Sequence, residues 1–123
     1  MSSQNKSILI VDDAPLIVAW VKQMLTGLPA VGVVYEAGSY QEALEVFSSS
    51  HPDIVLLDIN LPDINGIELL RYIKKVYPSV MVIMLTNQSG DFYRTKCKEL
   101  GADYFLDKST EFDRVPDILS SLL

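Results

Sequence analysis

The sequence predicts a doubly wound parallel α/β domain in which five strands alternate with five helices. Five short apolar runs alternate along the chain with segments whose apolar residues recur at helical spacing. The middle runs are continuously apolar, which is typical of strands that are buried on both faces of a sheet. Because the chain has 123 residues, 49% of them apolar, we expect one domain with a single core over residues 1–123.

The first half of the chain is predicted to form a strand, a helix, a strand and a helix. Residues 7–11 (SILIV) and 31–37 (VGVVYEA) are the two strands. Pro15 lies in the first turn of the first helix and Gly27 marks its end, while Ser39 and Glu42 form a capping box before the second helix. The apolar face expected for the first helix comprises Ile17, Trp20, Val21, Met24 and Leu28.

The second half is predicted to continue the same alternation. Residues 53–58 (DIVLLD), 80–86 (VMVIMLT) and 104–107 (YFLD) are the three strands. A helix spans about 90–100, and the last helix has Pro116 in its first turn and Asp113 as its cap. The helix between the third and fourth strands has one apolar face, made of Ile67, Leu70, Ile73 and Tyr77.

Composition disfavours several classes of function. The net charge of −6 disfavours direct binding to nucleic acid, because phosphate contacts need a basic surface. No apolar run reaches the eighteen or so residues of a membrane span, and no signal peptide is evident, so we expect a cytoplasmic protein without membrane contact. Cys97 is predicted to be a packing residue, and His51 is assigned no role.

Polar residues collect at the carboxyl ends of the predicted strands, where the functional crevice of an open parallel sheet lies. Asp12 and Asp13 follow the first strand, and Asp58 ends the third. Carboxylates that converge without histidine or thiolate suit a hard cation such as Mg²⁺. Thr86 and Lys108, at the ends of the fourth and fifth strands, add a hydroxyl and a positive charge. The set therefore favours phosphoryl transfer.

Taken singly, each of these residues has an ordinary structural explanation. An acid at the start of a helix is favoured by the helix dipole, and an aspartate near a glycine, such as Asp63 before Gly66, is a common turn former. A threonine or lysine at the end of a strand is also common by itself. Only their joint placement at one edge of the sheet indicates a site.

The motifs that hold these residues resemble the receiver domains of bacterial two-component response regulators over essentially the whole chain. The matching segments are ILIVDDAP, PDIVLLDINLPDINGIELL, VIMLT and GADYFLDK. The resemblance implies a flavodoxin-like (βα)5 fold with strand order 2-1-3-4-5. It fits a stand-alone single-domain response regulator, and it equally fits the receiver part of a longer protein.

The resemblance implies that Asp58 accepts a phosphoryl group from the phosphohistidine of a histidine kinase or phosphotransfer protein. Asp13 and Asp58 would bind Mg²⁺ through their carboxylates, Asn60 through its backbone carbonyl and Asp12 mainly through water. Such a domain catalyses its own phosphorylation and slow dephosphorylation but turns over no separate substrate, so its status as an enzyme stays open.

The resemblance also assigns the switch. Thr86 and Lys108 would contact the phosphoryl group together with the backbone amide of Asn87, and Phe105 would turn inward behind Thr86. A downstream protein would then bind the last two helices and the fifth strand, and a phosphorylation-dependent dimer is also compatible. The residues expected to be exposed on that surface are Asp91, Tyr93, Lys96 and Glu111.

Three residues depart from the family pattern. Phe105 keeps the aromatic ring of the usual tyrosine but lacks its hydroxyl. Ser109 replaces the proline that usually follows the lysine in a cis peptide, and a cis bond before a residue other than proline costs about 2.5–4 kcal/mol. Either Lys108–Ser109 is nevertheless cis or the loop differs. Asn87 replaces a small residue, and we expect its side chain to limit access to Asp58.

Two other functions remain as alternatives. One is an inactive receiver that serves only as a protein-interaction module. The other is a Mg²⁺-dependent aspartyl-phosphate phosphatase of the haloacid dehalogenase type, which would need an acid two residues after Asp58, where Asn60 stands. A flavin-binding module is disfavoured by the acids after the first strand, and a nucleotide hydrolase by the lack of a GxxxxGK segment.

Overall fold

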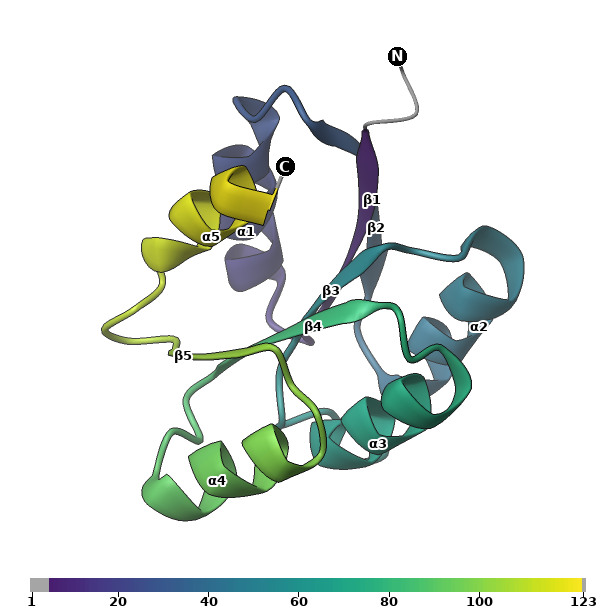
Figure 1. Cartoon of the computed structure of the whole chain (residues 1–123), viewed down its shortest axis with the longest axis vertical. Helices are drawn as coiled ribbons and strands as arrows, with labels where there is room; N and C mark the ends of the chain where they lie inside the picture. The colour runs from purple at the N-terminus through teal and green to yellow at the C-terminus, as the bar shows by residue number, and fades with distance from the viewer. Residues whose placement is uncertain (1–4, 123) are drawn as a thin grey trace.

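The computed structural model describes residues 5–122, and it confirms the predicted alternation of strands and helices (Figure 1). Within this range no helix is long and apolar enough to cross a membrane. The strands are β1 (Lys6–Val11), β2 (Val31–Ala37), β3 (Ile54–Leu57), β4 (Met81–Thr86) and β5 (Tyr104–Asp107). The helices are α1 (Pro15–Thr26), α2 (Tyr40–Ser50), α3 (Gly66–Val76), α4 (Asp91–Glu99) and α5 (Arg114–Leu122).

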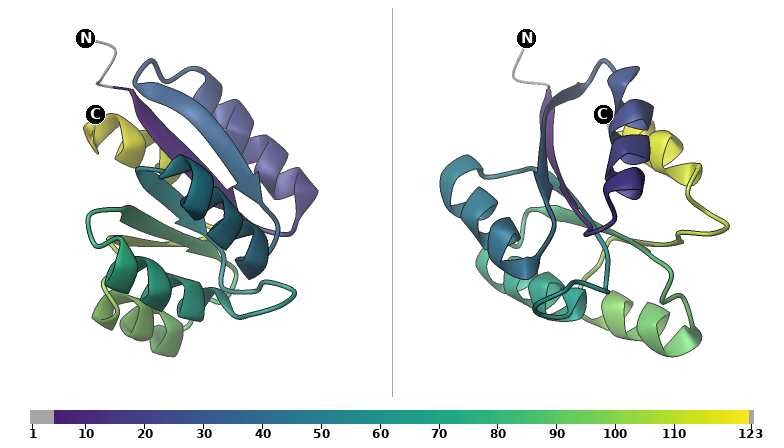
Figure 2. Two further views of the ribbon diagram at one scale, coloured as in Figure 1. Left: turned by 90° about the vertical axis from the view of Figure 1, so that its right-hand side faces the viewer. Right: turned by 180° about the vertical axis from the view of Figure 1, so that it is seen from behind.

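The strands form one parallel sheet in the order β2-β1-β3-β4-β5, as predicted. Helices α1 and α5 cover one face, and α2, α3 and α4 cover the other (Figures 1 and 2). All four residues of β3 are buried, because Val55 and Leu57 pack toward α2 and α3 while Ile54 and Leu56 pack toward α1 and α5. The continuously apolar sequence of β3 thus follows from its central position.

Cys97 lies in the layer between the sheet and α2, α3 and α4, and its side chain is fully buried. Burial raises the pKa of its thiol to about 11, because the thiolate would lose its hydration. The prediction that Cys97 is a packing residue is confirmed.

The predicted apolar face of α1 is wrong at Trp20. The residues that this helix buries are Val18, Val21 and Leu25, whereas Trp20 is 50% exposed. The buried seam is centred on Val21, and Trp20 lies beside it, where its ring meets Phe112 edge-on at a centroid distance of 6.1 Å. Trp20 therefore covers the rim of the contact between α1 and the segment before α5.

The start of α2 is capped as predicted at Ser39, whose Oγ accepts a hydrogen bond from Glu42 N at 3.1 Å. The Glu42 carboxylate accepts from Gly38 N, one residue before the atom that a capping box would use. Asp63 adds two unpredicted bonds, from Tyr40 N and Gln41 N at 2.9 and 3.0 Å. These backbone bonds lower the pKa of Asp63, and the bond from Gln41 N has the largest effect. They also join the loop after β3 to α2.

The start of α5 follows the sequence prediction in the position of Pro116. The helix begins at Arg114, so Pro116 lies in its first turn, where the missing N–H costs no helical hydrogen bond. Asp113 immediately precedes the helix.

Gly66 begins α3 at a point where two backbones nearly touch. Its N donates to Ile59 O at 2.7 Å, and Asn65 caps the same helix by accepting from Ile67 N. A Cβ at position 66 would lie 2.0 Å from Asp58 O, which is far inside van der Waals contact. Only glycine lets the helix approach the residue that ends β3 this closely.

We expect Gly66→Ala to lower the free energy of unfolding by about 2 kcal/mol or more, since the new methyl group must displace the backbone after β3. Urea denaturation measures this loss. Gly27→Ala is the matched control, because Gly27 has a φ of −87° and open space where its Cβ would stand. Equal stability losses in the two variants would contradict the close-approach explanation.

Candidate functional site

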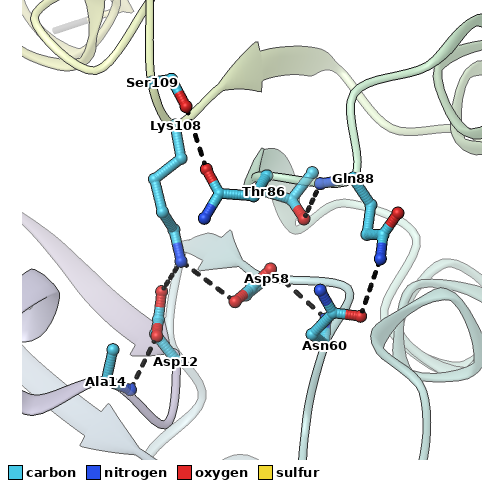
Figure 3. Close-up of polar contacts among 9 residues, drawn as sticks. Asp12, Ala14, Asp58, Asn60, Thr86, Gln88, Lys108 and Ser109 are labelled. Carbon is cyan, nitrogen blue, oxygen red and sulfur yellow. Dashed lines mark hydrogen bonds and ion pairs between the residues drawn. The ribbon is translucent and has the colours of Figure 1, made fainter.

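The crevice at the carboxyl edge of the sheet holds Asp12 after β1 and Asp58 after β3 (Figure 3). Each carboxylate is fixed by a main chain that continues the sheet beyond the strand. Asp12 N donates to Ala37 O and Asp58 N donates to Val11 O, both at 3.0 Å. Both residues are 5% exposed. Two acids from adjacent strands are therefore held almost out of solvent, as the sequence predicts.

Lys108 reaches into the crevice from the end of β5 and joins these two acids. Its Nζ donates to Asp12 Oδ2 at 2.7 Å and to Asp58 Oδ2 at 3.0 Å (Figure 3). The side chain is 8% exposed, so both ion pairs are shielded from water. The three predicted residues thus form one buried cluster.

The charges in this cluster do not balance. Burial raises the pKa of Asp12, and the hydrogen bond from Lys108 opposes this only in part. Burial alone would lower the pKa of Lys108, but its hydrogen bond to Asp12 and the charge of Asp58 raise it overall. The lysine therefore stays protonated while one ammonium serves two buried carboxylates. The site carries excess negative charge.

A third acid makes the site suitable for a cation. Asp12, Asp13 and Asp58 each offer a carboxylate oxygen within 4.8 Å of the others, and Asp13 is exposed to solvent. Within this group every ligand atom is oxygen, which is the donor set of a hard divalent ion. Asn60 lies next to the group, since its N donates to Asp58 Oδ1 at 3.3 Å. The acidic pocket could thus bind a metal ion.

Thr86 closes the crevice from the end of β4 and is fully buried. Its Oγ1 accepts from Gln88 N at 3.1 Å, which draws the hydroxyl into the loop that follows the strand (Figure 3). Gln88 also lies opposite Asn60, with 3.5 Å between its Nε2 and Asn60 Oδ1. Gln88 was not identified from the sequence. Its position two residues after the threonine that ends the strand could have indicated that its backbone N–H lies near the threonine hydroxyl.

The loop after Lys108 differs from the family pattern. The described residues contain no cis peptide bond, so Lys108–Ser109 is trans. Ser109 Oγ donates to Asn87 Oδ1 at 3.2 Å, which joins this loop to the one after β4. Asn87 is exposed, and its expected effect on access to Asp58 stays a prediction.

Phe105 is half-buried on β5, where it packs against the core beneath α4. The guanidinium carbon of Arg94 lies 4.7 Å from the centre of its ring, and Arg94 also donates to Phe105 O at 3.2 Å. A second guanidinium nitrogen of Arg94 is 3.5 Å from Glu111 Oε1. No sequence pattern indicated this cation–π contact, because eleven residues and a loop separate the partners.

We expect Asp12→Asn to stabilise the metal-free protein at pH 7 by about 1 kcal/mol. An acid with a raised pKa binds its proton more tightly in the folded chain, so stability falls as pH rises from 3.8 through the raised pKa. The advantage of the Asp12→Asn variant should therefore shrink as pH falls through that window. Urea denaturation with a chelator measures it.

Asp117→Asn, a change of an exposed acid on α5, is the matched control and should shift stability by less than about 0.5 kcal/mol. A destabilised Asp12→Asn variant at pH 7 would show that the ion pair with Lys108 outweighs the burial of the charge.

Known proteins resemble this chain in sequence and fold. The family model "Response regulator receiver domain" matches residues 8–120. The nitrate/nitrite response regulator protein NarL of Escherichia coli K12 is 35% identical over 125 residues, covering 99% of this chain and 56% of that protein. The transcriptional regulatory protein DegU of Brevibacillus brevis is 34% identical over 112 residues, covering 90% and 48%. The chain therefore spans about half the length of these curated relatives.

A solved structure agrees with the sequence relatives. The CheY-like response regulator receiver domain protein of Methanospirillum hungatei JF-1 is 31% identical, with a TM-score of 0.84 and coverage of 96% of this chain and 94% of that one. A match over nearly the whole chain, on the same fold, shows that this protein belongs to the receiver domains of two-component response regulators.

Proposed function

We propose that Asp58 is the phosphoacceptor and that the surrounding crevice catalyses phosphoryl transfer from the phosphohistidine of a histidine kinase or phosphotransfer protein. The observation that carries this proposal is the Lys108 ammonium, which is shared between Asp12 and Asp58 in a buried site. An Asp58 oxygen would form the new P–O bond while the P–N bond to histidine breaks, and the product is an acyl phosphate. Repulsion between anions is the main obstacle, so charge compensation is the main task.

Mg²⁺ is the proposed cation of the acidic pocket. The carboxylates of Asp13 and Asp58 and the backbone carbonyl of Asn60 would hold it, with Asp12 contributing mainly through water. The oxygen-only donor set and the excess negative charge support this choice. When bound, the ion neutralises phosphoryl oxygens, and the protein residues supply the positioning.

Lys108 and Thr86 are the proposed partners of the transferred group. Lys108 already spans Asp12 and Asp58, so a phosphoryl group on Asp58 brings new anionic oxygens to an ammonium held nearby. Thr86 Oγ1 accepts from Gln88 N, which leaves its O–H able to donate to the phosphoryl group, with the amide of Asn87 as a further donor. We propose Thr86 and Phe105 as the switch pair, and Arg94 lies over the Phe105 ring.

The proposed output is contact with a downstream protein through α4, β5 and α5. Asp91 is exposed there, as predicted, but Tyr93, Lys96 and Glu111 are half-buried, which corrects their expected exposure. Tyr93 packs against the core and Glu111 accepts hydrogen bonds, so neither side chain is free in solvent. Phe92 on α4 is 71% exposed, so it is a large apolar residue that this surface presents to solvent.

Direct nucleic-acid binding by this chain is not part of the proposal, given the net charge of −6. One relative that is 28% identical is named a DNA-binding transcriptional activator, and this chain covers 52% of its length. Dimerisation on phosphorylation remains compatible with the proposed output.

Incubation with Mg²⁺ and acetyl phosphate should add one phosphoryl group to the protein, since a small donor needs only the protein's own residues for transfer. Intact-mass spectrometry detects the gain. Asp58→Asn should abolish it, because the amide is not a nucleophile, and Asp53→Asn, five residues earlier at the opposite end of β3, should retain it. If the wild type gains no mass, the chain is an inactive receiver that serves only as an interaction module.

Mg²⁺ should raise the melting temperature of the wild type and should do so far less for Asp13→Asn. A ligand present at 100 times its dissociation constant stabilises a protein by about 2.7 kcal/mol, so differential scanning fluorimetry can resolve the difference. Asp117→Asn serves as the control and should respond like the wild type. Equal responses of the wild type and Asp13→Asn would place the ion elsewhere.

A further inference from the structure

Asp107, the last residue of β5, makes a set of hydrogen bonds that the proposed chemistry does not use. Its Oδ1 accepts from Ser109 N at 2.7 Å, and its Oδ2 accepts from the Ser89 hydroxyl. These bonds lower the pKa of Asp107, and the bond from the Ser89 hydroxyl has the largest effect. The carboxylate is therefore ionised at neutral pH, which makes both bonds charge-assisted.

The two partners of Asp107 belong to different loops of the crevice. Ser89 lies in the loop after β4, which begins at Thr86, and Ser109 follows Lys108 directly. A local turn at the end of a strand explains the bond from Ser109 N but not the bond from a second loop. One carboxylate thus ties together the segments that carry the two proposed partners of the phosphoryl group.

We propose that Asp107 is a positioning residue that fixes the main chain of Lys108 so that its ammonium is aimed at Asp58. The inference rests on the proposed function of Lys108. Lys108 N donates to Thr86 O at 2.9 Å, and the next amide, Ser109 N, donates to Asp107. The lysine backbone is therefore held on both sides, by the sheet before it and by Asp107 after it.

The departure from the family pattern at position 109 agrees with this role. A proline there could not donate a hydrogen bond, whereas Ser109 supplies the N–H that Asp107 binds. The long side chain of Lys108 has many rotamers, so a fixed main chain restricts where its Nζ can lie. Because small misplacements of a catalytic group slow a reaction strongly, loosening this anchor should be visible in the rate.

The test is a double-mutant cycle on the rate of phosphorylation by acetyl phosphate with Mg²⁺, followed by intact mass. Asp107→Leu removes both bonds and should slow the reaction about tenfold. Asp107→Asn keeps a carbonyl oxygen for Ser109 N and should restore the rate to within about threefold of the wild type. In a Lys108→Ala background Asp107→Leu should change the rate by less than about twofold, because the residue acts through the lysine.

Asp53→Leu is the matched control. The Asp53 carboxylate also accepts from a backbone N–H and a hydroxyl, both of Ser7, but it does so at the opposite end of the sheet. It should lose stability in urea without slowing phosphorylation more than about twofold. Should Asp107→Leu prove unfolded, Ser89→Ala replaces it in the cycle, with an expected loss of about threefold that also disappears without Lys108.

Two results would overturn the inference alone: an Asp107→Leu rate within about twofold of the wild type, or an equal loss in both backgrounds, which marks a general structural role. A wild type that is never phosphorylated, or a Lys108→Ala variant as fast as the wild type, would overturn the proposed function and this inference with it.

Discussion

The site depends on one interaction, the Lys108 ammonium shared by two buried carboxylates from neighbouring strands. Buried charges persist only when they are paired, so the position of Lys108 constrains Asp12 and Asp58 as much as they constrain it. Strand order makes the contact possible. Strands β1 and β3 are adjacent, and only β4 separates β3 from β5. The side chain of Lys108 spans this separation to reach Asp12 and Asp58. The charge that remains after pairing is negative, which is why the open side of the cluster suits a cation.

The rest of the fold holds Asp58 still at the rim of a crevice. Its strand is buried on both faces, and Asp58 N extends the sheet by bonding to Val11 O. After the acid the chain turns at once, with Gly66 packed against the Asp58 backbone and Asp63 capping α2. The loop that follows Asp58 is thus anchored at two points. Apolar burial supplies the rigid frame, and the polar contacts of the acid site lie at the ends of the strands.

Residue patterns predicted the parts of this protein that depend on local periodicity and on the geometry of parallel sheets. Apolar runs indicated the strands, and the rule that the ends of parallel strands meet at one edge of the sheet predicted that Asp12, Asp58 and Lys108 lie close together. Contacts that depend on how loops approach one another carry no such period. The pairs Ser89 with Asp107 and Arg94 with Phe105 join residues 18 and 11 positions apart. Trp20 was misplaced because helical spacing alone does not say which side of a stripe meets the next helix.

The lack of a hydroxyl on Phe105 changes which contacts this side chain can make with α4. A tyrosine could bind there through its oxygen, whereas the Phe105 ring is held by the Arg94 guanidinium from α4. Arg94 also contacts Glu111 Oε1, the same atom that accepts from Asp107 N at 2.9 Å. This backbone bond is the first cause of the lowered pKa of Glu111, so the shared acceptor is ionised at neutral pH. A displacement of the main chain next to Lys108 would therefore strain a charged contact to α4 directly. In this chain, charged hydrogen bonds among Asp107, Glu111 and Arg94 thus connect the residue before Lys108 to α4 without a tyrosine hydroxyl.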